Sequence, residues 1–142
     1  MTVGYFDTSA LVPLMVAETA TDRCARAWDA VDLVVTTSLA CVETRAALAM
    51  AMRMGRLTCE EHATALRAFA ARWQDAVIVH PADELLHHAG RLALDHALRG
   101  YDAVHCATAV AVASADFVAV SGDRDLLRAW GDLGIHTIDT TM

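Results

Sequence analysis

Short runs of apolar and β-branched residues alternate along this chain with longer stretches in which apolar residues recur every three to four positions. Strands that are separated by helices need crossover connections, and these produce a mainly parallel sheet with helices on both faces. The short runs carry few polar residues, as strands buried on both faces require. The alternation therefore predicts an α/β fold, a parallel sheet flanked by helices in an α/β/α sandwich.

The pattern predicts five strands and seven helices, with no repeat, low-complexity tract or Pro/Gly-rich linker between them. We therefore expect residues 1–142 to form a single domain. The capping box Thr58-x-x-Glu61 begins the fourth helix, and Gly55 ends the third. The predicted strands are Val3–Phe6, Leu33–Thr36, Val77–His80, Phe117–Val120 and His136–Ile138. The predicted helices are Thr8–Val16, Thr21–Ala30, Ser38–Met54, Cys59–Gln74, Ala82–Leu98, Tyr101–Ala113 and Arg124–Trp130.

The net charge of the chain bears on whether it can bind nucleic acid. The formal net charge is −7, and all eleven basic residues are Arg. A protein that holds nucleic acid through its own surface is usually basic. An acidic one either avoids nucleic acid or places metal cations between its carboxylates and the phosphates. The first residues lack the basic start of a secretory signal, and no stretch is long enough to span a membrane. We expect a cytoplasmic protein with no membrane partner.

The four cysteines lie far apart and form no CxxC pair. Each falls in a helical pattern, where a reduced thiol behaves as a small apolar residue and suits the cytosol. Cys59 and His62 have a spacing that zinc ligands can use, but no second pair stands nearby. A disulfide framework and a zinc site are both disfavoured. The cysteines are Cys24, Cys41, Cys59 and Cys106.

Four carboxylates fall at related points of the predicted fold. Asp7 ends the first strand, and Asp123 follows the Phe117 strand after two residues. Glu43 lies in the second turn of the helix after the second strand, and Asp102 lies in the first turn of the sixth helix. Ligands of parallel α/β sheets bind beyond the carboxyl ends of the strands. All four acids can therefore point into one crevice.

Two of these acids border apolar helix faces. Glu43 borders a predicted stripe made by Leu39, Val42, Ala46 and Met50. Asp102 heads a second stripe made by Cys106, Ala109 and Ala113. A carboxylate turned toward the core is costly unless it is protonated, paired or bound to a metal. The nearby sequence offers few fixed cations, so a divalent metal is the simplest counter-charge, and oxygen ligands favour Mg²⁺ or Mn²⁺.

Each Asp also has a structural explanation on its own. Asp7 and Asp123 precede helices and suit N-caps, and Asp102 near a helix start favours the helix dipole. Capping explains neither Glu43 nor the gathering of the acids at the ligand edge, so a shared site is the preferred interpretation.

Several other residues are weaker candidates for a functional role. Asp125, two residues after Asp123, is a further candidate metal ligand. His105 could assist the chemistry, although a hydrogen-bonded core histidine is the commoner case. We expect the three tryptophans to be core anchors rather than base-stacking platforms. These are Trp28, Trp73 and Trp130.

Four segments in order resemble the PIN domain, and more closely the VapC toxins of bacterial VapBC (type II) toxin–antitoxin pairs. Their spacing and the overall length resemble a VapC protein over the whole chain. The segments are Phe6-Asp7-Thr8-Ser9-Ala10-Leu11, Val42-Glu43-Thr44-Arg45-Ala46, Tyr101-Asp102-Ala103-Val104-His105-Cys106-Ala107-Thr108-Ala109 and Ser121-Gly122-Asp123-Arg124-Asp125-Leu126.

The resemblance implies a PIN-like fold and an Mg²⁺- or Mn²⁺-dependent endoribonuclease that hydrolyses RNA. It also implies a homodimer that is inhibited by a VapB-like antitoxin whose tail enters the acidic groove. By position, the catalytic and metal-binding quartet is Asp7, Glu43, Asp102 and Asp123. Ser9 and Ser121 are implied as supporting polar groups.

Other functions fit the sequence less well. A haloacid-dehalogenase-type phosphatase needs Asp-x-Asp after the first strand, where this chain has Asp7-Thr8-Ser9, and commonly a Lys. A receiver domain and a P-loop both need a Lys, which the chain lacks. A PIN fold that serves only as a binding module stays open.

Overall fold

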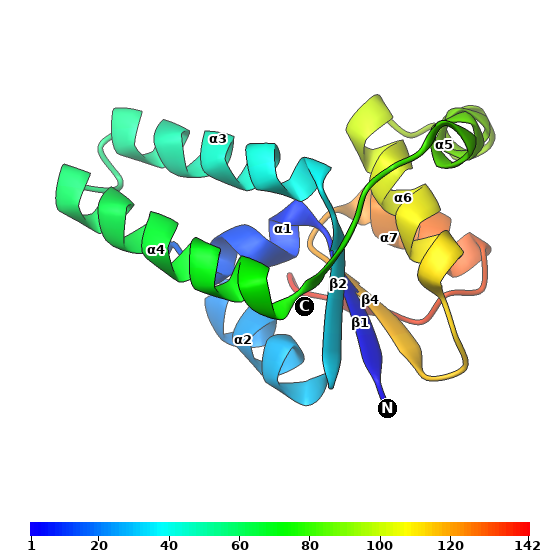
Figure 1. Cartoon of the computed structure of the whole chain (residues 1–142), viewed down its shortest axis with the longest axis horizontal. Helices are drawn as coiled ribbons and strands as arrows, with labels where there is room; N and C mark the ends of the chain where they lie inside the picture. The colour runs from blue at the N-terminus through cyan, green and yellow to red at the C-terminus, as the bar shows by residue number, and fades with distance from the viewer.

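The computed structural model describes residues 1–142, and its centre is one five-stranded parallel sheet (Figure 1). The strand order is β3-β2-β1-β4-β5, so the chain starts in the middle of the sheet and extends it to both sides. The strands are β1 (Val3–Phe6), β2 (Leu33–Thr37), β3 (Val77–Val79), β4 (Phe117–Ser121) and β5 (Thr137–Asp139). The helices are α1 (Thr8–Leu11), the 3-10 turn η1 (Val12–Leu14), α2 (Thr21–Ala30), α3 (Leu39–Arg53), α4 (Cys59–Asp75), α5 (Asp83–His96), α6 (Gly100–Val112) and α7 (Arg124–Asp132).

Helices cover both faces of the sheet, as predicted. Successive strand residues point to opposite faces, so Tyr5 packs into one core and Phe6 into the other. The Tyr5 core is closed by α5, α6 and α7, and the Phe6 core by α1 and α2 (Figure 1). Trp130 is fully buried in the Tyr5 core, as expected of an anchor. Trp28 and Trp73 are partly buried against the Phe6 core.

The ends of several elements differ from the predicted ones by one or two residues, but the first helix differs more. It was predicted to run from Thr8 to Val16, and the α-helix ends at Leu11. Pro13 follows in a short 3-10 turn, because a proline in a helix interior removes a backbone hydrogen bond. The prediction of one continuous helix here was wrong.

The helices α3 and α4 form a hairpin that projects past the sheet (Figure 1). Gly55 has a φ of 77°, which favours glycine and ends α3. Thr58 and Glu61 exchange the two hydrogen bonds of the predicted capping box, which begins α4. The predicted apolar stripe of α3 was wrong, since Val42 is 59% and Met50 51% exposed. The buried face consists of Ala40, Thr44, Leu48 and Ala51.

The predicted stripe headed by Asp102 on α6 is confirmed for Cys106 and Ala109, which are fully buried. It is wrong for Ala113, which lies beyond the end of α6 and is exposed.

All four cysteines are free thiols, of which Cys24 and Cys106 are buried. None of the helices combines the length and the apolar composition that a membrane span requires.

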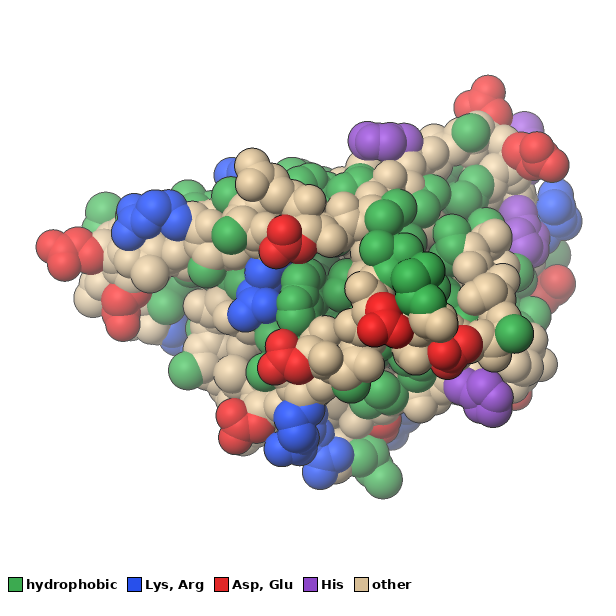
Figure 2. Space-filling model, turned by 60° about the horizontal axis from the view of Figure 1, so that its bottom comes forward, with side chains coloured by type: hydrophobic (Ala, Val, Ile, Leu, Met, Phe, Trp, Pro, Cys, Tyr) green, Lys and Arg blue, Asp and Glu red, His purple; other side chains and the backbone are tan.

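All strands point the same way, so their carboxyl ends share one edge, toward the top of Figure 1. The opposite edge is turned forward in Figure 2, where acidic and basic side chains lie interspersed. The segments that carry the four acids begin at the carboxyl edge.

Candidate active site

Asp7 is a buried carboxylate at the end of β1, with 4% of its surface exposed. It caps α1 by accepting from the Ala10 backbone N–H at 3.1 Å. Its Oδ1 also accepts from Ser9 Oγ at 2.7 Å, and its Oδ2 accepts from Ser121 Oγ at 2.7 Å. Burial raises the pKa of Asp7, although these hydrogen bonds and His105 oppose the rise. The fold thus holds a carboxylate whose negative charge lacks full compensation.

Ser9 and Ser121 connect the start of α1 to the end of β4. Besides donating to Asp7, Ser9 Oγ accepts from the Gly122 N–H at 2.8 Å, and Ser121 Oγ accepts from the Asp123 N–H at 2.9 Å. Each hydroxyl therefore links the carboxylate on β1 to the loop after β4. This arrangement fixes Asp7 and Asp123 relative to each other.

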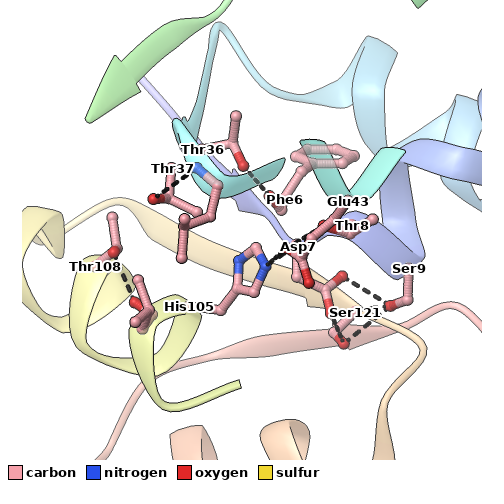
Figure 3. Close-up of polar contacts among 12 residues, drawn as sticks. Phe6, Asp7, Thr8, Ser9, Thr36, Thr37, Glu43, His105, Thr108 and Ser121 are labelled. Carbon is pink, nitrogen blue, oxygen red and sulfur yellow. Dashed lines mark hydrogen bonds and ion pairs between the residues drawn. The ribbon is translucent and has the colours of Figure 1, made fainter. Parts of the chain in front are cut away.

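Glu43 reaches toward the same edge from the second turn of α3. Its Oε1 accepts from Thr8 Oγ1 at 2.8 Å and lies 2.7 Å from His105 Nε2 (Figure 3). Burial alone raises the pKa of Glu43, but the hydrogen bond and attraction from His105, with the bond from Thr8, outweigh it and lower the pKa. Glu43 is therefore held in its ionised form.

His105 on α6 is 2% exposed and contacts Tyr5, Thr8 and Glu43. Its Nδ1 lies 2.8 Å from the hydroxyl of Tyr5 in β1. Because the Glu43 carboxylate accepts, Nε2 carries a proton and donates to it, which leaves Nδ1 to accept from Tyr5 when the ring is neutral. His105 is hydrogen-bonded and buried, as the commoner interpretation expects, and it also contacts the candidate site directly.

Asp102 and Asp123 complete the group. Asp102 in the first turn of α6 is partly buried and lies 3.4 Å from Arg99 Nε. Burial and the nearby Asp123 carboxylate raise the pKa of Asp102, against Arg99. Asp123 caps α7 by accepting from the Leu126 N–H at 2.9 Å. The two aspartates are close enough to repel each other.

Electrostatic contacts connect all four predicted acids. His105 favours the ionised forms of Asp7, Glu43 and Asp102, although burial leaves the pKa of Asp7 and of Asp102 raised. The Asp123 carboxylate raises the pKa of Asp102 further. Figure 3 shows Asp7, Glu43 and His105 turned toward one another, with Ser9 and Ser121 beside Asp7. Four elements thus bring their acids to one edge of the sheet.

Two sequence candidates lie elsewhere. Asp125 is exposed on α7 and pairs with Arg128 Nη1 at 2.8 Å. Cys59 is exposed at the start of α4. Tyr5 and Thr8 also belong to this network and were not predicted, although both flank the Phe6-Asp7 pair and adjacency to the first acid was an available signal.

The donor set fits a hard divalent cation, because it consists of carboxylate oxygens, one of them deeply buried with a raised pKa. No three Asp, Glu, His or Cys side chains are gathered as tightly as the ligands of one ion. Glu43 instead contacts Thr8 and His105, and Asp102 contacts Arg99. The carboxylates are near one another, and each is hydrogen-bonded within the protein.

Comparison with known proteins adds independent information. A sequence description of the PIN domain matches residues 4–131. Two ribonucleases of Mycobacterium tuberculosis, VapC45 and VapC49, are each 42% identical over 126 residues, which cover 89% of this chain and 88% of theirs.

Two solved structures show the same fold. PAE2754 from Pyrobaculum aerophilum has a TM-score of 0.69 at 24% identity, covering 99% of this chain and 86% of its own. VapBC-5 from Mycobacterium tuberculosis, described as a member of the VapBC family of toxin–antitoxin systems, has a TM-score of 0.61 at 22% identity, covering 98% and 99%.

Proposed function

The chain belongs to the PIN-domain family and, within it, to the VapC ribonucleases, and from this premise we propose that it is an Mg²⁺- or Mn²⁺-dependent endoribonuclease that acts as the toxin of a type II toxin–antitoxin pair. The observation that carries the proposal is the convergence of four carboxylates at the carboxyl edge of the sheet. We also propose that residues 1–142 act as one PIN domain, since the sheet includes strands from both ends of the chain.

The proposed metal ligands are Asp7, Glu43, Asp102 and Asp123. When bound, a divalent cation lowers the pKa of a water and neutralises charge on the phosphate. The protein's own part is to hold the carboxylates in place. Ser9 and Ser121 orient Asp7, and His105 and Thr8 orient Glu43 and favour its ionised form. No nucleophilic side chain is required, because water can attack the phosphodiester.

The charge of the chain is consistent with this assignment. A net charge of −7 repels RNA, and an acidic pocket becomes a phosphate receptor only with cations in it. Family membership favours the ribonuclease over the phosphatase alternative.

The nuclease test uses purified protein and RNA, with Mg²⁺ or Mn²⁺ and with EDTA. We expect cleavage with metal and none in EDTA. Asp7→Asn should abolish cleavage, since it removes a ligand charge with almost no change in volume. Asp95→Asn makes the same change at an exposed position of α5 and should cut at the wild-type rate. Undiminished cutting in EDTA, or by Asp7→Asn, refutes the proposed site, and a wild-type protein that cuts no RNA favours the binding-module alternative.

A small VapB-like antitoxin is the proposed partner. VapBC-5 is a solved relative from a toxin–antitoxin system, and an acidic pocket suits an inserted Arg or Lys. Expression of this chain alone should arrest growth, and co-expression with the adjacent small gene should relieve the arrest. A pull-down of the pair, repeated with the antitoxin's basic residues changed to Ala, tests the inserted cation. Harmless expression without association refutes the toxin role while leaving the nuclease test unaffected.

A further inference from the structure

A groove of 660 Å³ adjoins two of the four acids, Glu43 and Asp102. Sites that bind small ligands are typically about 300–1,000 Å³. Glu43 and Asp102 are proposed metal ligands and also form part of the wall of the groove, so a ligand in the groove lies next to these two carboxylates. The rest of the lining is mostly apolar and consists of Leu39, Leu86, Arg99, Gly100, Tyr101 and Val104.

Two large side chains of this groove are exposed. Tyr101, directly before Asp102, is 61% exposed, and Leu86 on α5 is 43% exposed. Gly100 carries no side chain, and no atom lies within 4 Å of the position that its Cβ would take. A ligand can therefore reach the backbone beside Tyr101. Arg99 stands almost fully exposed next to Asp102. The groove thus combines an aromatic ring, an aliphatic wall and one cation.

We propose that this groove is a nucleobase subsite, in which the base of the nucleotide beside the scissile phosphate stacks on Tyr101. The inference rests on the proposed ribonuclease function and adds how the substrate is held. A strand whose phosphate lies at the acids can place a neighbouring nucleotide in the groove, because Glu43 and Asp102 form part of its wall.

The chemistry of the lining selects the base rather than the phosphate. The aliphatic side chains of the lining offer a phosphate no hydrogen bond, and the two carboxylates repel it, whereas bases of single-stranded RNA stack on aromatic side chains. Arg99 can contact the flanking phosphate or stack on the base itself. Since the overall charge is −7, stacking is a means of holding RNA that needs no basic surface.

Binding is tested without relying on cleavage. Uniformly ¹⁵N-labelled protein is titrated with AMP, GMP, CMP and UMP, and with ribose 5-phosphate as the control that lacks a base. We expect the amide signals of Leu86, Tyr101 and Val104 to shift with the nucleotides and not with ribose 5-phosphate. Tyr101→Ala should weaken binding about 5- to 100-fold, and Tyr101→Phe should retain it. Leu94→Ala, exposed on α5 outside the groove, should bind like the wild type.

Cleavage gives a second readout. After the cut is mapped in an RNA oligonucleotide, the same oligonucleotide is made with an abasic nucleotide on either side of the cut. The wild type should cleave one abasic RNA about 5- to 100-fold more slowly in kcat/KM. Tyr101→Ala should cleave the intact RNA slowly and show no further loss with the abasic one.

The outcomes separate this proposal from the nuclease assignment. Nucleotide-induced shifts in a protein that cuts no RNA support the subsite and refute the nuclease. Cleavage that is indifferent to Tyr101→Ala and to the abasic positions refutes the subsite. If that variant instead weakens only the capture of a co-expressed antitoxin, the groove is a protein-docking surface and the proposal is overturned.

Discussion

Replacing Tyr5 with Phe removes one hydroxyl from the most buried part of the polar network. The ring is fully buried in β1, and its hydroxyl lies 2.8 Å from His105 Nδ1. Burial, with a further contribution from Asp7, raises the pKa of Tyr5 well above its ordinary value, so the hydroxyl keeps its proton and donates. Phe has nearly the same shape, so the change leaves no large cavity.

The cost follows from the group that loses its partner. His105 Nδ1 stays buried without a donor, which costs about 1–3 kcal/mol. The desolvation of the tyrosine hydroxyl disappears at the same time and offsets part of this, so we expect a net loss of about 1–2 kcal/mol. For a chain of this size that lowers Tm by about 3–8 °C.

Urea titrations followed by tryptophan fluorescence measure the free energy of unfolding. The matched control is Tyr101→Phe, the same chemical change at a tyrosine that is 61% exposed, and its effect should stay within about 0.5 kcal/mol. If Tyr5→Phe is as stable as the wild type, the Tyr5–His105 hydrogen bond contributes nothing and the proposed tautomer loses its support. An equal loss in the control also refutes the reasoning.

Three further predictions concern charge, metal and assembly. Burial raises the pKa of Asp7 above its unfolded value near 3.8, so the stability that its protonated form contributes at low pH is lost as pH rises. In urea titrations without metal, Asp7→Asn should therefore become progressively more stable than the wild type as pH rises above about 4. A difference that does not change with pH contradicts this. Millimolar Mg²⁺ should raise the Tm of the wild type by mass action and leave the Tm of Asp7→Asn unchanged. If the Tm does not shift at any Mg²⁺ concentration and calorimetry detects no binding, the metal pocket is refuted. The expected homodimer would cover the exposed side chains of Val42 and Met50 on α3. Met50→Lys should yield monomers in sedimentation experiments, with a folded far-UV circular dichroism spectrum and a Tm that no longer rises with protein concentration. A monomeric wild type refutes the dimer.

Much of the fold and the candidate quartet followed from local sequence patterns. Alternating strand and helix periods are local properties, so they predicted a parallel sheet between helices and most element boundaries. Asp7 and Asp123 could be assigned to the ligand edge because each directly follows a strand and caps the next helix. Glu43 and Asp102 were predicted at the same edge from their turn within a helix.

The buried face of α3 could not be predicted in this way. Its exposed and buried faces both recur at helical spacing, and Val42 and Met50 are more apolar than Thr44. Hydrophobicity therefore favoured the wrong face. Packing decided the orientation, because α4 and the turn after Pro13 cover Leu48 and leave Met50 outside.

The polar network around the acids also depends on tertiary structure. Tyr5 and His105 are 100 residues apart, and His105 and Glu43 are 62 apart. A histidine in a helix has the same local sequence signature whether it contacts solvent, core or a carboxylate. The pairing of β1 with β4 and the packing of α6 against the sheet bring these side chains within hydrogen-bonding distance, so the sequence by itself determined which acids reach the edge of the sheet, and only the fold decided which groups hold them there.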